Sequence, residues 1–463
     1  MRPRLPCGRG ISRRSFVVAG AGLAGLTLAD LLRADTGSPK KGSPKSILNI
    51  HLDGGPPQHD TIDPKPDAPE EIRGDLKAIK SKLTGVHLCE LMPRVAALAD
   101  KFVFLRSLVG STGQHDGFQT QSGWDAKSVA SVGGRPAMGS VVAKLFGKPA
   151  DTVPPFVDLM QGRPLVRNSA RPGYLGPAFA PFRPDISDKF PRELEEGMKV
   201  ELQRGAARPS LQLSLVDGLN PERLADRQSL LNHFDDLRRE VDQSGTMDAL
   251  DQFGQQAVSI LTSGKLAKAL TWDDEPESVV KLYTPPASNL AKFETGEDEN
   301  SAKKLLLARR LLEAGVRCVS VSFSDFDTHS QNFPRMKKLV PIVDHALAAL
   351  VTDLSDRGML NDVAIVVWGE FGRTPKVAKD GGRDHWPEVG PALLAGGGWK
   401  PGQVIGATDK LGGRVVDRPV SYEDVFATLY HTLGVDARKT HFKDPSGRPQ
   451  AVLDGGTVLK ELV

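Results

Sequence analysis

The stretch Val363-Ala364-Ile365-Val366-Val367-Trp368, followed directly by Gly369-Glu370-Phe371-Gly372-Arg373, decides the fold class. A continuous apolar run of this kind is typical of a strand that is buried on both faces, as in a parallel sheet. Similar apolar runs predict further strands at 47–52, 102–105, 316–323 and 391–395.

Helical patterns alternate with these strands through the last third of the chain. They predict helices at 301–314, 339–357 and 422–433, and a short helix at 94–100 lies nearer the N-terminus. This alternation favours an α/β fold with a mostly parallel sheet and helices on both sides. Ligands of such sheets bind beyond the carboxyl ends of the strands, so the residues that follow each strand are the first candidates for function.

Composition and missing motifs exclude several classes of protein. The chain has 463 residues with 60 Lys and Arg against 57 Asp and Glu, and this net charge of +3 gives no reason to expect a nucleic-acid partner. No G-x-G-x-x-G motif follows the first predicted strand, and a P-loop motif and a G-x-S-x-G elbow are missing, which argues against NAD, ATP and α/β-hydrolase chemistry. The three cysteines form no C-x-x-C pair. Cys89 and Cys318 are expected to be buried free thiols, and a disulfide between them is the alternative if the protein is exported.

The N-terminal segment has the pattern of an export signal. Arg13 and Arg14 precede Ser15-Phe16 and then an apolar run rich in glycine and alanine from 17 to 29. That run is too short to span a bilayer, and the paired arginines resemble a twin-arginine signal; a basic start of a short helix is the alternative. We therefore expect a signal at 1–36, a linker at 37–45 and a domain at 46–463, with an irregular and helical insertion at about 150–300. The expected location is the periplasm or cell surface, the expected partner for transport is the twin-arginine export machinery, and no stable membrane span is expected.

Acidic residues and histidines recur where the predicted strands end. These positions, with two arginines that accompany them, are Asp53, His59, Asp60, His115, Asp116, Asp325, Asp327, His329, Glu370, Arg373, Arg383, Asp384 and His385. Carboxylates and imidazoles together suit zinc, manganese or iron, and carboxylates alone suit calcium or magnesium. Each pair also has a plainer interpretation as a turn, a helix cap or a surface ion pair, and Asp384 could simply orient His385. The other histidines, His51 among them, are expected to be structural or exposed.

Five sequence blocks resemble one known family. They are GGPPQHDTIDPKP at 54–66, GYLG at 173–176, DTH at 327–329, GEFGRTP at 369–375 and GRDHWP at 382–387. With the signal-like N-terminus, they resemble the DUF1501 family, which is grouped with the alkaline phosphatase/sulfatase superfamily. The resemblance implies a three-layer α/β/α fold and descent from metal-dependent hydrolases.

The resemblance also assigns roles to individual residues. It implies divalent metal ions (zinc, manganese, calcium or magnesium), with ligands at Asp53, Asp327, His329, Glu370, Asp384 and His385. Arg373 is expected to contact an anionic group, since its planar fork suits oxyanions. No Cys/Ser-x-Pro-x-Arg motif surrounds the cysteines, so the nucleophile is sought in the loop that holds Ser111, Thr112 and His115, or in a metal-bound water.

Three hypotheses about function follow. The first is an exported, metal-dependent hydrolase of sulfate or phosphate esters that acts on a small-molecule or polysaccharide substrate, with Arg373, Thr112 and His115 as catalytic residues. The second is a non-catalytic binding or cell-surface protein on the same fold. The third is a metal-dependent isomerase or mutase of phosphorylated compounds.

Overall fold

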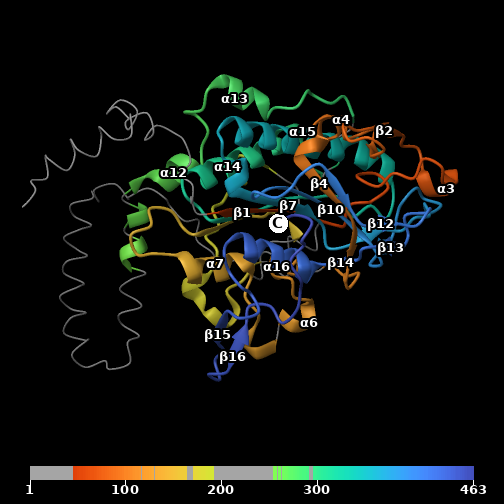
Figure 1. Cartoon of the computed structure of the whole chain (residues 1–463). Coiled ribbons are helices and arrows are strands. Elements are labelled where there is room, and N and C mark those ends of the chain that lie inside the picture. Colours follow the sequence, from red (N-terminus) through yellow and green to blue (C-terminus); the bar gives the residue numbers. More distant parts are fainter. Residues whose placement is uncertain are drawn as a thin grey trace, which may run out of the picture. The chain divides into compact units, whose positions relative to one another are not determined.

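The computed structural model describes residues 45–463 apart from 116, 130, 164–169, 192–253, 258, 262, 291–292 and 294–295 (Figure 1). The predicted export signal, all of the predicted linker except Lys45, and residues 192–253 of the predicted insertion lie outside the described residues. Everything described belongs to one unit, Pro44–Val463.

A central sheet of eight strands organises this unit. The strand order is β11-β4-β10-β7-β1-β6-β5, with β14 beside β4. The bounds are β1 Ser46–Leu52, β4 Phe102–Val109, β5 Phe156–Leu159, β6 Cys318–Phe323, β7 Val363–Trp368, β10 Gly390–Gly396, β11 Gln403–Ile405 and β14 Val420–Ser421. β10 runs antiparallel to its neighbours β4 and β7, and the other pairings within this sheet are parallel. The predicted mostly parallel sheet is confirmed.

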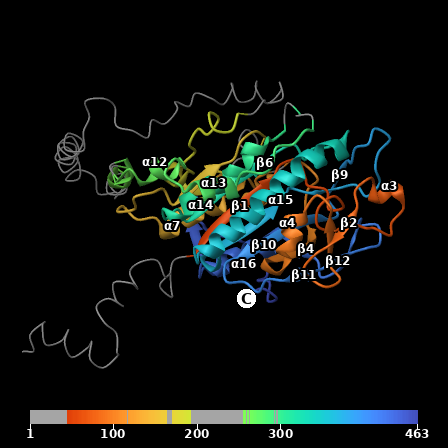
Figure 2. The same ribbon diagram turned by 90° about the horizontal axis from the view of Figure 1, so that it is seen from above.

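Helices cover both faces of the sheet and complete a three-layer α/β/α fold (Figures 1 and 2). One face carries α4 (Pro93–Ala97), α14 (Lys303–Glu313) and α15 (Asn332–Asp356), and the other carries α7 (Met138–Phe146) and α16 (Tyr422–Thr432). The fold class expected from the sequence is therefore confirmed.

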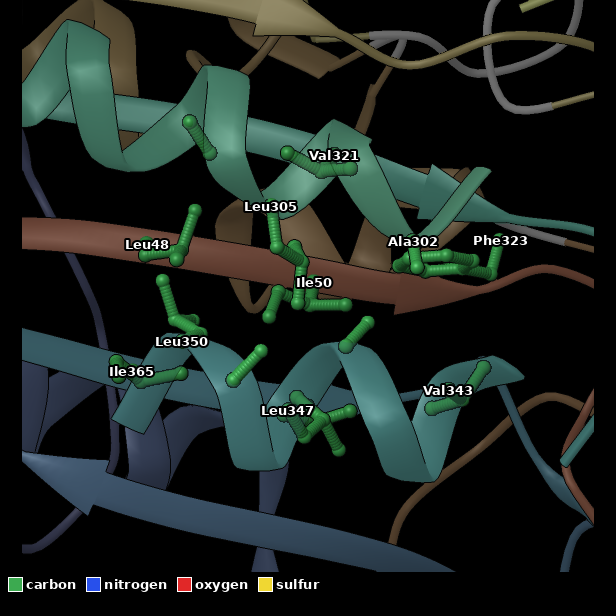
Figure 3. Packing of buried hydrophobic residues seen from close by; sticks show 14 of the residues in the cluster. Leu48, Ile50, Ala302, Leu305, Val321, Phe323, Val343, Leu347, Leu350 and Ile365 are labelled. Carbon is green, nitrogen blue, oxygen red and sulfur yellow. The ribbon is translucent and has the colours of Figure 1, made fainter. Parts of the chain in front are cut away.

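The two faces of the central strands receive different side chains because strand residues alternate in direction. Leu48 and Ile50 of β1 lie in the core between α14 and α15, close to Leu305 and Leu347 (Figure 3). Ile47 belongs to the second core, beneath α7 and α16. This alternation on buried strands explains why the sheet can hold two separate apolar cores.

Short helices and two-stranded sheets make up the remaining regular structure of the described residues. The short helices are α3 Glu70–Arg73, α5 Gln119–Ser122, α6 Ala126–Val129, α12 Lys265–Ala269 and α13 Glu277–Leu282. The two-stranded pairs are β2 Ala78–Lys80 with β3 His87–Cys89, β8 Gly372–Arg373 with β9 His385–Trp386, β12 Ala407–Thr408 with β13 Val415–Asp417, and β15 His441–Lys443 with β16 Pro449–Ala451.

Three element boundaries differ from the sequence-based expectations. β4 continues to Val109, because its last residues pair with β14 and β10. β5 forms an edge strand within the segment expected to be irregular, where pairing with β6 decides the backbone conformation. α15 begins at Asn332, earlier than expected, because Pro334 lies in the first turn, where a missing N–H costs nothing.

The cysteines within the described residues are both free. Cys89 lies in β3 and Cys318 in β6, and both are buried. The alternative of a Cys89–Cys318 disulfide is wrong, and the expectation of buried thiols is confirmed. Burial raises the pKa of Cys89 to about 12, so this thiol is not a nucleophile at neutral pH. Among the described helices, none is both long enough and apolar enough to cross a membrane.

Candidate metal centre

One edge of the sheet gathers most of the predicted site residues. Asp53 follows β1 directly, Asp327 lies in the loop after β6, and Glu370 lies just after β7. These three strands are parallel neighbours, so their carboxyl ends meet. Because β10 is antiparallel to β7, the segment that precedes it reaches the same edge and brings His385 there.

Two glycines let the loop after β1 pass close to its neighbours. Gly54 and Gly55 have positive φ values of 108° and 82°, a region that other residues rarely adopt. A Cβ on Gly54 would lie 2.3 Å from the Asp327 nitrogen, and one on Gly55 would lie 2.4 Å from the Phe371 ring. The close contact between the loops therefore requires glycine at both positions.

Three side chains, which we call the outer group, form a partly exposed cluster: His115, Asp327 and His385. Their ligand atoms all lie within 4.8 Å of one another. His115 Nε2 is 3.1 Å from Asp327 Oδ2, and His385 Nε2 is 3.4 Å from Asp327 Oδ1. His329 lies against this group, with its Nε2 3.2 Å from Asp327 Oδ1 and 3.0 Å from His385 Nε2.

A second, fully buried cluster lies beside it, and we call it the inner group: His51, Asp53 and Glu370. His51 Nε2 is 3.5 Å from Glu370 Oε2 and 4.0 Å from Asp53 Oδ1. The other oxygen of Glu370 accepts hydrogen bonds from the Gly54 amide at 3.0 Å and from His115 Nδ1 at 2.8 Å. His115 therefore joins the two groups, with one ring nitrogen on each.

The electrostatics of the two groups favour ionised carboxylates. Burial by itself would raise the pKa of Asp327, but hydrogen bonds from His115, His385 and Arg373 lower it well below its usual range. Burial likewise opposes ionisation of Glu370, yet the hydrogen bond from His115 lowers its pKa to about 2. Desolvation alone would lower the pKa of the His115 imidazole, but its hydrogen bonds to Asp327 and Glu370 outweigh this effect and raise the pKa. The edge of the sheet thus concentrates negative charge where a cation could be held.

A predicted ligand, Asp384, and a predicted catalytic residue, Thr112, lie at the rim of the site. Asp384 has a side chain that is 66% exposed, and its Oδ1 lies 2.8 Å from His329 Nδ1. It therefore orients His329 and joins neither group. Thr112 is exposed, and its hydroxyl accepts a hydrogen bond from the Gln114 amide at 3.4 Å, within the same turn. Ser111 donates to the Glu370 backbone carbonyl at 2.6 Å.

Arg373 is fully buried and binds the protein itself. Its guanidinium donates to the carbonyls of Gly54, Gly55 and Arg383. It also donates to Asp327 Oδ1 at 2.7 Å. These bonds make Arg373 a brace for Asp327, and contact between Arg373 and an anionic group stays a prediction.

His59, Asp60 and Arg383 lie apart from both groups. Arg383 and Asp60 form a fully buried ion pair, with Nε 3.2 Å from Oδ2. His59 Nε2 lies 2.7 Å from the Leu411 carbonyl oxygen. Burial and the nearby Arg383 lower the pKa of His59 to about 4, so the ring is neutral and donates this proton to the carbonyl. These residues hold the loop after β1 against its neighbours.

Two residues of the site were not expected from the sequence. His51 was interpreted as structural, although a histidine inside an apolar strand, two residues before Asp53 and on the same face as Asn49, is a usable signal. Arg163 follows β5 and donates to Asp327 Oδ2 at 3.0 Å. Desolvation works against its charge, but Asp53, Asp327 and Glu370 together raise its pKa. Because strand β5 was not predicted, the position of Arg163 at this edge of the sheet could not be predicted either.

The donor atoms fit a divalent cation. Imidazole nitrogens and carboxylate oxygens are the ligands of zinc and manganese, and both groups supply only these. His51 Nε2 and Glu370 Oε2 are buried without a hydrogen-bond partner, which is costly unless another species binds them.

Comparisons with known proteins find one matching family and several distantly similar solved structures. Residues 44–463 match the family described as "Protein of unknown function (DUF1501)". A search of curated proteins finds no match. Among solved structures, a sulfatase from Pseudoalteromonas sp. shares 13% identity at a TM-score of 0.35, covering 92% of this chain and 72% of its own. A protein in the alkaline phosphatase superfamily from Vibrio parahaemolyticus shares 10% identity at a TM-score of 0.37, with coverage of 87% and 69%. A phosphonate monoester hydrolase from Silicibacter pomeroyi shares 12% identity at a TM-score of 0.34, with coverage of 85% and 73%. The family match spans nearly the whole described unit, and the chain belongs to the DUF1501 family.

Proposed function

We propose that this protein is a metal-dependent hydrolase of sulfate or phosphate esters. The observation that carries the proposal is the convergence of the outer and inner groups at the carboxyl edge of the sheet. Two adjacent sets of nitrogen and oxygen donors at a strand edge form the usual setting for metal-assisted hydrolysis.

The outer and inner groups would hold the metal, with His329 as a further donor to the outer group. A divalent cation bound there would lower the pKa of a water molecule and neutralise charge on the transferring group. Arg373 holds Asp327 in position through its 2.7 Å bond. Arg163 keeps some exposure, 11% of its side chain, and we assign the contact with the substrate's anionic oxygens to this residue.

The proposal is tested by measuring metal content and ester hydrolysis together. Purified protein should contain a divalent metal by elemental analysis and should hydrolyse 4-nitrophenyl sulfate or 4-nitrophenyl phosphate. His385→Gln should lower both, because an amide is a poor replacement for an imidazole ligand. His441→Gln is the matched control, since His441 is exposed on β15, away from the site edge. Metal-free protein that still hydrolyses these esters would refute the proposal.

A non-catalytic binding protein is the second candidate, and the hydroxyl groups near the site favour it. Ser111 is bonded to a backbone carbonyl and Thr112 to its own turn, so neither is positioned as a nucleophile in this structure. Protein that binds metal stoichiometrically but hydrolyses no sulfate or phosphate ester would support this candidate.

We also propose that the protein is exported through the twin-arginine pathway to the periplasm or cell surface. The support is the Arg13–Arg14 pair before an apolar run rich in glycine and alanine. Replacing both arginines with lysine should leave the protein in the cytoplasm. Unchanged export of that variant would contradict the proposal.

A further inference from the structure

The inner group contains a polar contact that is unfavourable as it stands. His51 Nε2 and Glu370 Oε2 are both buried, both without a hydrogen-bond partner, and 3.5 Å apart. Asp53 Oδ1 lies 4.0 Å from the same nitrogen. The nature of this contact depends on which ring nitrogen of His51 carries the proton.

The contact between His51 Nδ1 and Thr120 shows which ring nitrogen carries the proton. The Thr120 hydroxyl oxygen lies 2.9 Å from His51 Nδ1 and 2.9 Å from the Gly117 carbonyl oxygen. A hydroxyl group has one proton to donate but can also accept. A carbonyl can only accept, so satisfying both contacts requires Thr120 to donate to Gly117 and His51 Nδ1–H to donate to Thr120.

In this tautomer the Nε2 of His51 carries a bare lone pair. His51 Nε2 makes no hydrogen bond in this structure, although two carboxylate groups lie within 4.0 Å of it. A lone pair then faces the carboxylate oxygens of Glu370 and Asp53 in an environment that excludes water. A lone pair and a carboxylate oxygen 3.5 Å apart, both buried and both without a hydrogen-bond partner, repel each other unless a cation lies between them.

We infer that His51 Nε2 is a metal ligand of the inner group and that Thr120 is the positioning residue that fixes its tautomer. This inference rests on the metal-dependent hydrolase proposed above and deepens it by naming the atom of His51 that binds the metal and the residue that orients the ring. A ligating histidine commonly donates its second ring N–H to a neighbouring acceptor, and Thr120 supplies that acceptor.

The surroundings of Thr120 hold its hydroxyl in place. Its backbone carbonyl accepts a hydrogen bond from Asn49 Nδ2 at 2.7 Å. Asn49 Oδ1 in turn accepts from Trp368 Nε1 at 2.8 Å. This chain of bonds runs beneath the inner group from β7 through β1 to α5, and each of these three side chains is buried. A rigid acceptor of this kind is what a fixed tautomer requires.

The first experiment reads the tautomer directly in the metal-free full-length protein. Long-range ¹H–¹⁵N NMR of the histidine side chains should show the His51 proton on Nδ1. Thr120→Val removes the hydroxyl at nearly constant shape and should populate the Nε2–H form, whereas Thr120→Ser should keep the wild-type tautomer. A proton on Nε2 in the wild-type protein would overturn the inference, and this measurement needs no variant.

The second experiment measures Zn²⁺ binding by calorimetry. Thr120→Val should weaken binding at one site by about 10–100-fold, the usual cost of losing a residue that orients a ligand. Thr120→Ser should bind like the wild type, and His51→Gln should lose the site. His345→Gln is the matched control, because His345 is also buried and contacts one backbone carbonyl, that of Leu282.

The outcomes separate this inference from the proposed function. If Thr120→Val and His51→Gln fold normally and bind Zn²⁺ like the wild type, the inference fails whether or not esters are hydrolysed. If binding depends on both residues but no sulfate or phosphate ester is hydrolysed, the inference stands and the proposed function fails.

Discussion

The two faces of strand β1 perform different tasks, although both are buried. On one face, Leu48 and Ile50 pack against α14 and α15 in a large apolar core. On the other face, Asn49 and His51 lie beneath α5 and lead by hydrogen bonds to the inner group. Burial alone therefore does not distinguish the two faces of β1. The alternating polar residues show which buried face leads to the candidate site.

The largest effect is expected from breaking the apolar face. Ile50→Ala should lower the free energy of unfolding by about 2–5 kcal/mol, because the removed methyl groups leave a cavity in a rigid core. Chemical denaturation monitored by circular dichroism measures this loss. Val416→Ala is the control, since Val416 is 65% exposed.

Zn²⁺ binding by Ile50→Ala tests whether the two faces of β1 are independent. Ile50 points away from the inner group, so the folded fraction of Ile50→Ala should bind Zn²⁺ with wild-type affinity. A loss of affinity larger than the loss of folded protein would show that the two faces are not independent.

The sequence predicted the strands well because their signal is local. The apolar runs of β1, β6, β7 and β10 lie within a few positions of the structural bounds. The convergence of Asp53, Asp327 and Glu370 was also predictable, since parallel neighbours end at the same edge.

The parts that the sequence did not predict depend on longer-range contacts. Arg163 reaches the site from an edge strand whose formation depends on β6. The long side chain of Arg373 folds back onto the loop after β1, which no spacing rule describes. His51 lies inside its strand, whereas the rule used for the candidates selects residues that follow a strand, although the alternation of the polar residues Asn49 and His51 is visible in the sequence.

His59, in the loop after β1, is buried but belongs to neither face of the strand, and its protonation affects stability in a different way. His59 is neutral in the folded protein, because burial and Arg383 lower its pKa from about 6.5 to about 4. Between these two pH values, His59 binds a proton in the unfolded chain but not in the folded protein. The free energy of unfolding therefore falls as the pH drops from about 6.5 to about 4. The shift corresponds to about 3 kcal/mol.

Denaturation at several pH values tests this expectation. His59→Gln should flatten the dependence between pH 6.5 and 4, because glutamine does not titrate and can still donate to the Leu411 carbonyl. His441→Gln, with an exposed ring, should leave the dependence unchanged. An equally steep fall in His59→Gln would assign the pH dependence to other groups.

A smaller effect is expected from breaking the polar face at the residue next to Ile50. Asn49→Ala leaves the Trp368 N–H and the Thr120 carbonyl without their partners, which costs about 1–3 kcal/mol for a buried group. Unlike Ile50→Ala, this variant should also weaken Zn²⁺ binding, because Thr120 loses its support. Asn300→Ala removes a half-buried asparagine that donates to the Lys189 carbonyl and should cost less. Wild-type Zn²⁺ affinity in Asn49→Ala would show that Thr120 does not need this bond.

The smallest effect is expected at the start of α16, the helix that covers the polar face. The Ser421 hydroxyl accepts from the Asp424 amide at 3.1 Å, and Asp424 Oδ2 accepts from the Ser421 amide at 2.8 Å. Ser421→Ala removes the first of these bonds and should cost about 1 kcal/mol, while Ser421→Thr should keep it. The next residue, Tyr422, donates to the Gly369 carbonyl beside Glu370, so α16 does contact the site loop. The cap itself holds only the helix end, and Ser421→Ala should therefore lower thermal stability without changing Zn²⁺ affinity. A matching loss of affinity would mean that the position of α16, and not only the chain from Asn49 to His51, sets the geometry of the inner group.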